Sequence, residues 1–458
     1  MIIHVGKCHS FGIKKVYGKA KQVKPTLYLN NTLINPIEIG DSFLYLGRYF
    51  DFMMSNKEHM QILSDVLTEY LTKINNLPLH QKNKINIYQR YVLPKISWHL
   101  TVTDIPLTWI KQNLDNLVSK HLRLWLSIPI SGTLDVITLS RDKYGLNVVM
   151  TSSKTVQCRT TFRQCLKHST NPDIRELHKN TSENTNIQYD TYKSTREVIK
   201  DIRNKTITHI SHLTTQKLVI SAIWEYADAK FNKNWQKMLS KLPRGIYSFV
   251  IRYLNNTLPN ATNTFKWKIS NSQNCNYCHN AQTLGHVVGG CKTFLEEKRY
   301  NWRHDSILQA LCDLIPINST ISVYADIPGF PSPCIITGEE QRPDIVVKFQ
   351  DTLWILELTV GFETNIRKNF DRKQDNYHSL IHRLETNYSK VTYVNLSMGA
   401  CGIIGKDSKL NNFLTQFNIP PSDVSYHITK IMNIGARSTY YIFCRRNKDW
   451  LKPALMSW

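Results

Sequence analysis

The pattern of apolar and polar positions changes several times along the chain. Residues 1–50 alternate short strand-like runs with turns, whereas from about residue 56 to 127 apolar residues recur every three or four positions. That spacing is typical of helices that bury one face. The first stripe consists of Ile62, Leu63, Val66, Tyr70 and Ile74. A second, in "KINIYQRYVLPKISWHL", is expected to be interrupted at Pro94. We therefore expect a mainly helical N-terminal half.

The second half of the chain changes character twice. Residues 168–215 are polar and contain few large apolar groups, which favours a linker or a loosely packed insertion. A further helical stretch follows, and after the Pro-rich junction "DIPGFPSPCIITG" the pattern becomes strand, strand, long helix, strand. We expect a multidomain α plus α/β protein with segments at 1–50, 51–140, 141–240, 241–320 and 321–458.

A cysteine cluster lies between the further helical stretch and the Pro-rich junction. "CNYCHNAQTLGHVVGGC" spaces Cys275, Cys278, His286 and Cys291 as C-x2-C-x7-H-x4-C. Three thiolates and one imidazole complete a tetrahedral zinc shell with no open position, so the spacing predicts a structural zinc site. The alternatives are unliganded buried thiols, or His279 in place of His286.

One carboxylate stands inside a strand-like apolar run. "RPDIVVKF" and "LWILELTV" are separated by "QDT", which predicts a β-hairpin whose alternation places Glu357 on a mostly buried face. A carboxylate buried alone is costly and calls for a cation. Asp344, at the start of the partner strand, supplies a second acidic group across the hairpin. Paired carboxylates suit magnesium or manganese.

The following helix supplies a basic residue on the same side. In "NIRKNFDRKQDNYHSLIHRL" the apolar stripe consists of Ile366, Phe370, Tyr377, Ile381 and Leu384, and Lys373 falls on that stripe. Lys368 and Arg372 are expected to face solvent. Lys373 therefore either completes a site with the two carboxylates, or only neutralises Glu357 as a buried ion pair or extends outward to solvent.

The amino-acid composition indicates which class of binding partner to expect. The chain carries 58 Lys and Arg against 35 Asp and Glu, a formal charge of +23, which favours a polyanion over a small acidic metabolite. Nucleic acid is the expected partner, with a solvated basic surface as the alternative. No long apolar segment or signal layout occurs, and ten cysteines spread over 458 residues do not form a dense disulfide framework. We expect a soluble intracellular protein.

The motifs together resemble the C-terminal region of non-LTR retrotransposon polyproteins that carry a restriction-enzyme-like endonuclease. The resemblance rests on the Cys-Cys-His-Cys knuckle, "RYNWRHDSIL", "RPD", "ELTVGFE" and "RKQDNY", in that order. Upstream, "KCHSFGIKK", "FLYLG" and "YQRYVLPKISWHL" look like the end of a reverse-transcriptase palm and its thumb. It implies a palm end at 1–50, a thumb at 51–140, a knuckle region at 241–320 and a nuclease domain at 321–458.

The resemblance also implies site residues. Asp344 and Glu357 would hold catalytic Mg or Mn, and Lys373 would complete the site, because Thr359 stands where the nuclease superfamily usually has its lysine. Nucleic acid would contact Arg303, His304, Lys82, Lys84 and Arg90. "RHD" stands where the family more often has Arg-His-Asn, so no role is carried over to Asp305.

The expected activity follows from that family. Nicking of target DNA would prime reverse transcription of the element's RNA, in the nucleus, without a membrane partner. The polymerase's Tyr/Phe-x-Asp-Asp motif is missing, and "VYAD" at 323–326 is in the wrong place to replace it, so no reverse-transcriptase activity is expected of this chain. The alternatives are a zinc-containing nucleic-acid-binding fragment whose nuclease has decayed, and a structural or assembly protein.

Overall fold

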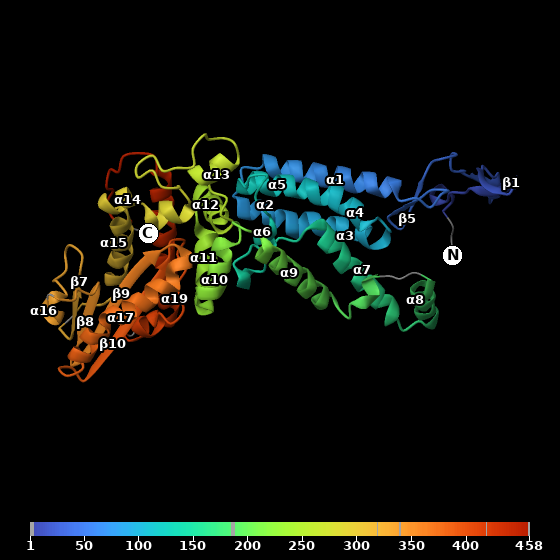
Figure 1. The fold of residues 1–458 in the computed structure, drawn as a ribbon. Coiled ribbons are helices and arrows are strands. Elements are labelled where there is room, and N and C mark those ends of the chain that lie inside the picture. The colour runs from blue at the N-terminus through green and yellow to red at the C-terminus, as the bar shows by residue number, and fades with distance from the viewer. Residues whose placement is uncertain (1–3, 185–187, 318, 339, 418, 457–458) are drawn as a thin grey trace. The chain divides into compact units, whose positions relative to one another are not determined.

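The computed structural model describes residues 4–184, 188–317, 319–338, 340–417 and 419–456 (Figure 1). Its contacts divide the chain into two compact units. Unit 1 comprises residues 1–125 and 148–204, and unit 2 comprises residues 126–147 and 205–458. The chain therefore leaves and re-enters each unit, which differs from the consecutive segments expected from the sequence.

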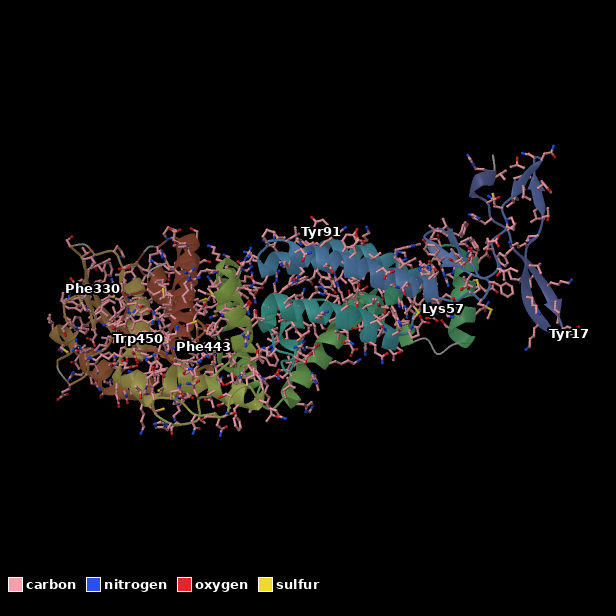
Figure 2. All side chains as sticks on the ribbon, turned by 90° about the horizontal axis from the view of Figure 1, so that it is seen from above. Tyr17, Lys57, Tyr91, Phe330, Phe443 and Trp450 are labelled. Atoms are coloured by element: carbon pink, nitrogen blue, oxygen red, sulfur yellow. The ribbon has the colours of Figure 1, made fainter. Side chains whose placement is uncertain are left out.

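Unit 1 opens with three small hairpins, in agreement with the strand-like runs of residues 1–50. Each is a separate two-stranded antiparallel sheet: β1 (Gly12–Val16) with β2 (Lys19–Val23), β3 (Leu27–Leu29) with β4 (Thr32–Ile34), and β5 (Phe43–Tyr45) with β6 (Arg48–Phe50). Tyr17, labelled in Figure 2, forms the tip of the first hairpin together with Gly18.

Helices follow, as predicted. They are α1 (Lys57–Asn76), α2 (Gln81–Ile87), α3 (Leu93–Val102), α4 (Leu107–Ile110), α5 (Asn116–Leu126) and α7 (Thr151–Lys167). The buried stripe of α1 differs from the predicted one: Leu63 and Ile74 are buried, but Leu67 and Leu71 replace Val66 and Tyr70. The leucines complete an i, i+4 row, which packs as one ridge.

Pro94 does not interrupt its helix. The chain runs from α2 through a π turn (Tyr88–Val92) directly into α3, with Pro94 in the first turn of α3. A proline has no N–H to donate to the carbonyl four residues earlier, and a π turn shifts that hydrogen-bond register. The expected interruption is therefore wrong.

Residues 168–215 are not a linker. They form α8 (Pro172–Asn184) and α9 (Thr195–His212), with residues 185–187 outside the described part. Polar contacts replace large apolar groups here: the buried Arg163 guanidinium donates to the Asp190 carboxylate at 2.6 Å and to Thr181 at 2.8 Å. The low apolar content of residues 168–215 therefore reflects helices that pack through polar contacts, and not a segment without packing.

Unit 2 begins with helices and ends in an α/β domain. The helices are α6 (Asp135–Thr138), α10 (Leu218–Tyr226), α11 (Asn232–Lys241), α12 (Arg244–Leu254), α13 (Ala261–Lys266), α14 (Lys292–Glu296) and α15 (Arg299–Cys312). Among the helices that the structure describes, none is both long and apolar enough to cross a membrane.

A four-stranded sheet forms the C-terminal part. Its order is β10 (Lys390–Gly399), β9 (Thr352–Gly361), β8 (Ile345–Phe349), β7 (Ile321–Ala325); β10 and β9 are parallel and the other neighbours antiparallel. β8 and β9 form the predicted hairpin. The predicted long helix is α17 (Ile366–Leu384), and it connects β9 to β10. The strand β7, which precedes the Pro-rich junction and α16 (Cys334–Thr337), was not predicted.

Both faces of the sheet are covered. Leu353 and Ile355 of β9 pack against Tyr377, Leu380 and Leu384 of α17. Trp354, on the opposite face, contacts Phe413 of α18 (Leu410–Thr415). The alternation of β9 thus holds, but residues of both parities are buried because helices lie on both sides, as expected for a strand in a parallel pair.

The last helix, α19 (Pro421–Cys444), packs against α15 and also against α11. The Asn234 side chain of α11 donates to the Ser425 carbonyl at 2.8 Å. Trp235 Nε1 donates to the Cys401 carbonyl, in the turn after β10, at 3.3 Å. Helices from the middle of the chain therefore share one core with its C-terminal part.

Candidate functional site

The four residues of the cysteine cluster converge in unit 2. Their ligand atoms all lie within 4.8 Å of one another. Cys291 Sγ is 4.0 Å from Cys275 Sγ and 3.8 Å from Cys278 Sγ, and Cys278 Sγ is 3.3 Å from His286 Nε2. Tetrahedral zinc with Zn–S bonds of about 2.3 Å separates its sulfurs by about 3.8 Å. The cluster could therefore hold one zinc ion, and His279 is outside it.

Local structure presents these four ligands. A backbone bond from Cys275 N to Asn280 O, 2.8 Å long, closes the first pair into a turn. His286 begins a π turn (His286–Gly290), and the Tyr300 hydroxyl accepts from Cys291 N at 3.0 Å and donates to His286 O at 3.1 Å. The loop also approaches the end of β9 closely, since a Cβ at Gly285 would lie 3.0 Å from the Phe362 ring.

Asp344 and Glu357 meet at the start of the β8–β9 hairpin. Ile345 pairs with Leu356, so Asp344, one residue earlier, lies beside Glu357. Asp344 N donates to Glu357 Oε2 at 3.3 Å, and Leu358 N donates to Asp344 Oδ2 at 2.7 Å. The Glu357 side chain is 3% exposed and that of Asp344 13%. The two carboxylates thus lie at one buried point.

Lys373 of α17 completes this cluster. Its Nζ donates to Glu357 Oε1, while the side chain stays 23% exposed. Three bonds from β10 fix α17 to the sheet: the Tyr393 hydroxyl donates to Lys373 O at 3.2 Å, Asn395 Nδ2 donates to Phe370 O at 2.7 Å, and Ser397 Oγ donates to Ile366 O at 2.8 Å. Lys368 is exposed, as predicted. Asp344, Glu357 and Lys373 are therefore brought together by adjoining elements.

His304 joins the same group from α15. Its Nε2 lies 3.2 Å from Asp344 Oδ2 and 3.2 Å from Leu358 O, and its Nδ1 lies 3.2 Å from Asp305 Oδ1. We expected this histidine to contact nucleic acid; in the chain alone it is flanked by two carboxylates. Asp305, to which we assigned no role, thereby becomes part of the cluster.

A fourth carboxylate comes from the unpredicted strand. Asp326 directly follows β7, its N–H donates to Asp344 O at 2.9 Å, and its carboxylate forms an ion pair with Arg342. Burial, together with the charges of Asp344 and Asp305, raises the Asp326 pKa against the opposing effect of Arg342. "VYAD" was set aside as a misplaced polymerase motif, yet its aspartate lies beside Asp344.

The electrostatics of the cluster are strongly perturbed. Burial and the neighbouring Asp344 raise the pKa of Glu357 to about 7, although Lys373 acts in the opposite direction. Burial lowers the pKa of His304, but Asp344 and Asp305 outweigh it and bring that pKa to about 10. The His304 imidazole is therefore protonated at neutral pH, whereas the Glu357 carboxyl group is about half ionised at that pH. Such paired shifts are typical of functional sites, although structural ion pairs also produce them.

Arg303 is not available to a phosphate, which corrects our expectation. The residue is 0% exposed, and its guanidinium donates to Val360 O at 3.1 Å and Thr439 Oγ1 at 3.2 Å. It lies on the inward face of α15, between β9 and α19. Its role in this structure is to hold the end of β9.

A second buried carboxylate follows β9. Glu363 is 0% exposed, accepts from the Tyr253 hydroxyl, and accepts from Cys401 N at 2.9 Å. Burial raises its pKa to about 7 against the hydrogen bonds that stabilise the ionised form. This group links α12 to the sheet and was not predicted, because a single Glu at the end of a strand carries no local signal.

The remaining predicted nucleic-acid contacts lie in unit 1. Arg90 is exposed, whereas Lys82 and Lys84 are half-buried. Lys84 Nζ donates to the Asn75 carbonyl at 2.7 Å. The Arg90 side chain is thus accessible to a ligand at the π turn, whereas Lys84 also stabilises the end of α1.

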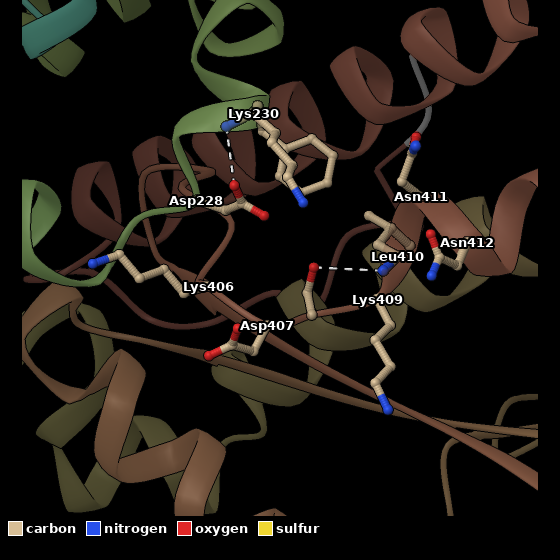
Figure 3. A pocket seen from close by; sticks show the side chains of 10 residues that line it. Asp228, Lys230, Lys406, Asp407, Lys409, Leu410, Asn411 and Asn412 are labelled. Atoms are coloured by element: carbon tan, nitrogen blue, oxygen red, sulfur yellow. Dashed lines mark hydrogen bonds between the residues drawn. The ribbon is translucent and has the colours of Figure 1, made fainter.

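Unit 2 also has a polar pocket beside α18 (Figure 3). It is lined by Asp228, Lys230, Phe231, Lys406, Asp407, Ser408, Lys409, Leu410, Asn411 and Asn412. Asp228 accepts from the Lys230 backbone at 3.0 Å, and Asp407 lies 3.6 Å from Arg367 of α17. None of the predicted site residues lines this pocket.

No protein-family model matches the chain, and no curated protein matches it significantly. The case for a function therefore rests on the geometry of the carboxylate cluster and on the resemblance of the motifs.

Proposed function

We propose that this chain is a divalent-metal-dependent DNA endonuclease module of the non-LTR retrotransposon type. The observation that carries the proposal is the convergence of Asp344, Glu357 and Lys373 at one point of the sheet. The order of strands and helix around them supports a restriction-enzyme-like nuclease. The Cys-Cys-His-Cys cluster upstream supports the same family resemblance, with zinc in a structural role.

The donor set fits a hard cation. Asp344 Oδ2 accepts from Leu358 N, whereas no hydrogen bond to Asp344 Oδ1 is found among the described residues. Together with the Glu357 carboxylate it offers the oxygen ligands that Mg²⁺ or Mn²⁺ prefers. When bound, such an ion would supply Lewis-acid stabilisation of charge at a phosphate and a more acidic bound water.

Side chains around the metal ligands would orient the reacting groups and stabilise charge. Lys373, which contacts Glu357, can orient a water or a phosphate oxygen with its two remaining N–H donors. Protonated His304 holds the Asp344 carboxylate and can lend positive charge beside the scissile phosphate. The Glu357 carboxylate, held by Lys373, can share the cation with Asp344.

Basic residues elsewhere would position the strand. Arg90, Lys82 and Lys84 remain candidates for backbone contacts, which supply affinity without sequence information. By the same resemblance the natural product of nicking, a 3′ hydroxyl, would prime reverse transcription of the element's RNA in the nucleus by a polymerase motif that this chain lacks.

A second candidate function also has a specific observation in its favour. Asp344 and Glu357 are already paired with His304 and Lys373, which suffices for a purely structural ion network. A zinc-containing nucleic-acid-binding fragment with a decayed nuclease would show the same contacts. It would bind DNA but not cleave it.

A plasmid-nicking assay separates the two. Supercoiled plasmid is incubated with the purified chain in Mg²⁺, in Mn²⁺ or without added divalent cation. The proposal expects metal-dependent nicked circles and their loss in Asp344→Ala and Glu357→Ala, with DNA affinity nearly unchanged. Binding without nicking in either metal would establish the decayed fragment instead.

A further inference from the structure

The β1–β2 hairpin is a small ribbon whose two strands pair only with each other among the described residues. Its register runs from Gly12 opposite Val23 to Val16 opposite Lys19. The base is tied down, because Gln22 Nε2 donates to Glu38 O at 3.1 Å and Gly40 N donates to Gln22 Oε1 at 3.2 Å. The rest of the ribbon, from Ile13 to Lys21, is largely exposed.

One face of this ribbon is a lysine face, consisting of Lys14, Lys19 and Lys21. Lys14 lies directly opposite Lys21, and Lys19 lies two residues further toward the tip on the same side. All three are exposed. The sequence has no Asp or Glu before Glu38, which pairs with Lys24. The lysine face therefore has no acidic side chain of its own ribbon to neutralise it.

This charge arrangement works against the hairpin. Like charges directly opposite each other destabilise a strand pair, and a two-stranded hairpin has little stability to lose. Edge lysines do protect exposed strands from aggregation, which accounts for some of the charge. Protection alone does not require two lysines at the same cross-strand position.

The tip carries an independent sign of a contact surface. Tyr17 is 100% exposed and has φ +48°, and Gly18 has φ +77°. Two positive φ values in a two-residue loop are those of a type I′ turn, which strongly favours Asn-Gly. A bulky aromatic residue at the first position is strained, and its ring lies in solvent (Figure 2). Stability of the turn does not explain this tyrosine.

We propose that the β1–β2 ribbon docks into the major groove of duplex DNA, with the lysine face on phosphates and Tyr17 leading into the groove. A two-stranded ribbon with its side chains matches the width of the B-form major groove. The deep groove of A-form RNA is too narrow for it. Lysine and tyrosine side chains are both common phosphate ligands. The ribbon belongs to unit 1, so this proposal is independent of cleavage by unit 2.

Binding by the full chain tests this surface. Fluorescence anisotropy of a labelled 30-base-pair DNA duplex is measured from low to physiological salt, without added Mg²⁺ or Mn²⁺. The logarithm of the association constant falls linearly with the logarithm of the salt concentration. Loss of three phosphate-contacting lysines makes this line less steep, by about 2.7, and weakens binding at physiological salt roughly 100-fold. We expect that loss for the triple variant Lys14→Gln, Lys19→Gln, Lys21→Gln, and near-parental binding when the same lysines are changed to Arg.

A matched control removes three exposed lysines elsewhere in unit 1: Lys167→Gln, Lys179→Gln and Lys193→Gln. It changes net charge equally and should leave the slope close to parental. Tyr17→Asn creates the preferred Asn-Gly turn, so the hairpin is kept while the ring is lost, and duplex affinity should still fall several-fold. Absence of nicking by the parental chain, with duplex affinity still lost in the ribbon variant, would count against the proposed function and not against this surface.

Three outcomes would overturn the proposal. The first is an unchanged salt slope in the ribbon variant. The second is an equal loss in the control variant, which would show a net-charge effect only. The third is a loss confined to a duplex RNA or single-stranded DNA probe of the same sequence, which would assign the ribbon to a different nucleic acid.

Discussion

Replacing Lys373 by Met tests whether this lysine acts in cleavage or only balances the charge of Glu357. In the folded chain Glu357 has a pKa of about 7, raised from an ordinary value of 4.5. Between these two pH values the unfolded chain releases a proton that the folded chain keeps, so stability falls as pH rises. One pKa unit corresponds to about 1.4 kcal/mol, so the loss from this group reaches about 3 kcal/mol at pH 7 and then levels off.

Lys373→Met removes the cation beside Glu357, so the Glu357 pKa rises further. The stability of the variant therefore continues to fall with pH beyond the point where that of the parent becomes constant. At pH 7 the carboxyl group of the parent is already half protonated. The variant is therefore only slightly less stable than the parent at pH 7, and the difference grows toward pH 9 to at most about 3 kcal/mol. Urea titration of both proteins at the two pH values measures this difference as a midpoint shift. A shift of equal size at both pH values would contradict the protonation of Glu357.

Activity is the second readout. If Lys373 orients the attacking water, Lys373→Met should nick plasmid at least about 100-fold more slowly at pH 7, where its stability is nearly parental. Lys368→Met is the control, since Lys368 is exposed on the same helix. A folded Lys373→Met protein that nicks at the parental rate would refute a catalytic role, and the lysine would then be a charge partner only.

Four further outcomes are expected. The chain should bind one zinc ion, and Cys278→Ser should release it and unfold the neighbouring segment, as measured by elemental analysis and proteolysis. Glu363→Gln should flatten the pH dependence of stability between pH 4.5 and 7, because it removes a raised pKa worth about 3 kcal/mol over that range; an unchanged profile would contradict the buried ionisable group. Arg303→Met should cost about 1–3 kcal/mol through unsatisfied buried acceptors, whereas a reduced salt slope of DNA binding would restore its predicted phosphate contact. Primer extension with deoxynucleotides should give no product, since the polymerase motif is missing.

Part of the candidate site was predictable because its signals are local. Alternation along β9 and a 3.6-residue stripe on α17 are short-range patterns, and they place Glu357 and Lys373 on facing surfaces. Asp344 follows from the hairpin register. The zinc ligands are likewise a matter of spacing within seventeen residues.

The other half of the cluster has no local signal. His304 comes from α15 and Asp326 from the end of β7, and only the antiparallel pairing of β7 with β8 brings Asp326 to Asp344. Arg303 was assigned to a phosphate through the family resemblance, but the rotation of α15 turns it inward. In the polar helices after residue 168, ion pairs such as Arg163 with Asp190 replace apolar contacts, so composition alone suggested a linker.

The packing of α11 against α19 has a consequence for biosynthesis. Asn234 contacts a residue 191 positions later, and Trp235 one 166 positions later. During translation the apolar faces of these middle helices stay uncovered until residues 401 and 425 have left the ribosome. Long-range closure of this kind is slow and exposes a nascent chain to aggregation. Unit 2 should therefore depend on chaperones while it is made, whereas unit 1 can fold once residue 204 has emerged.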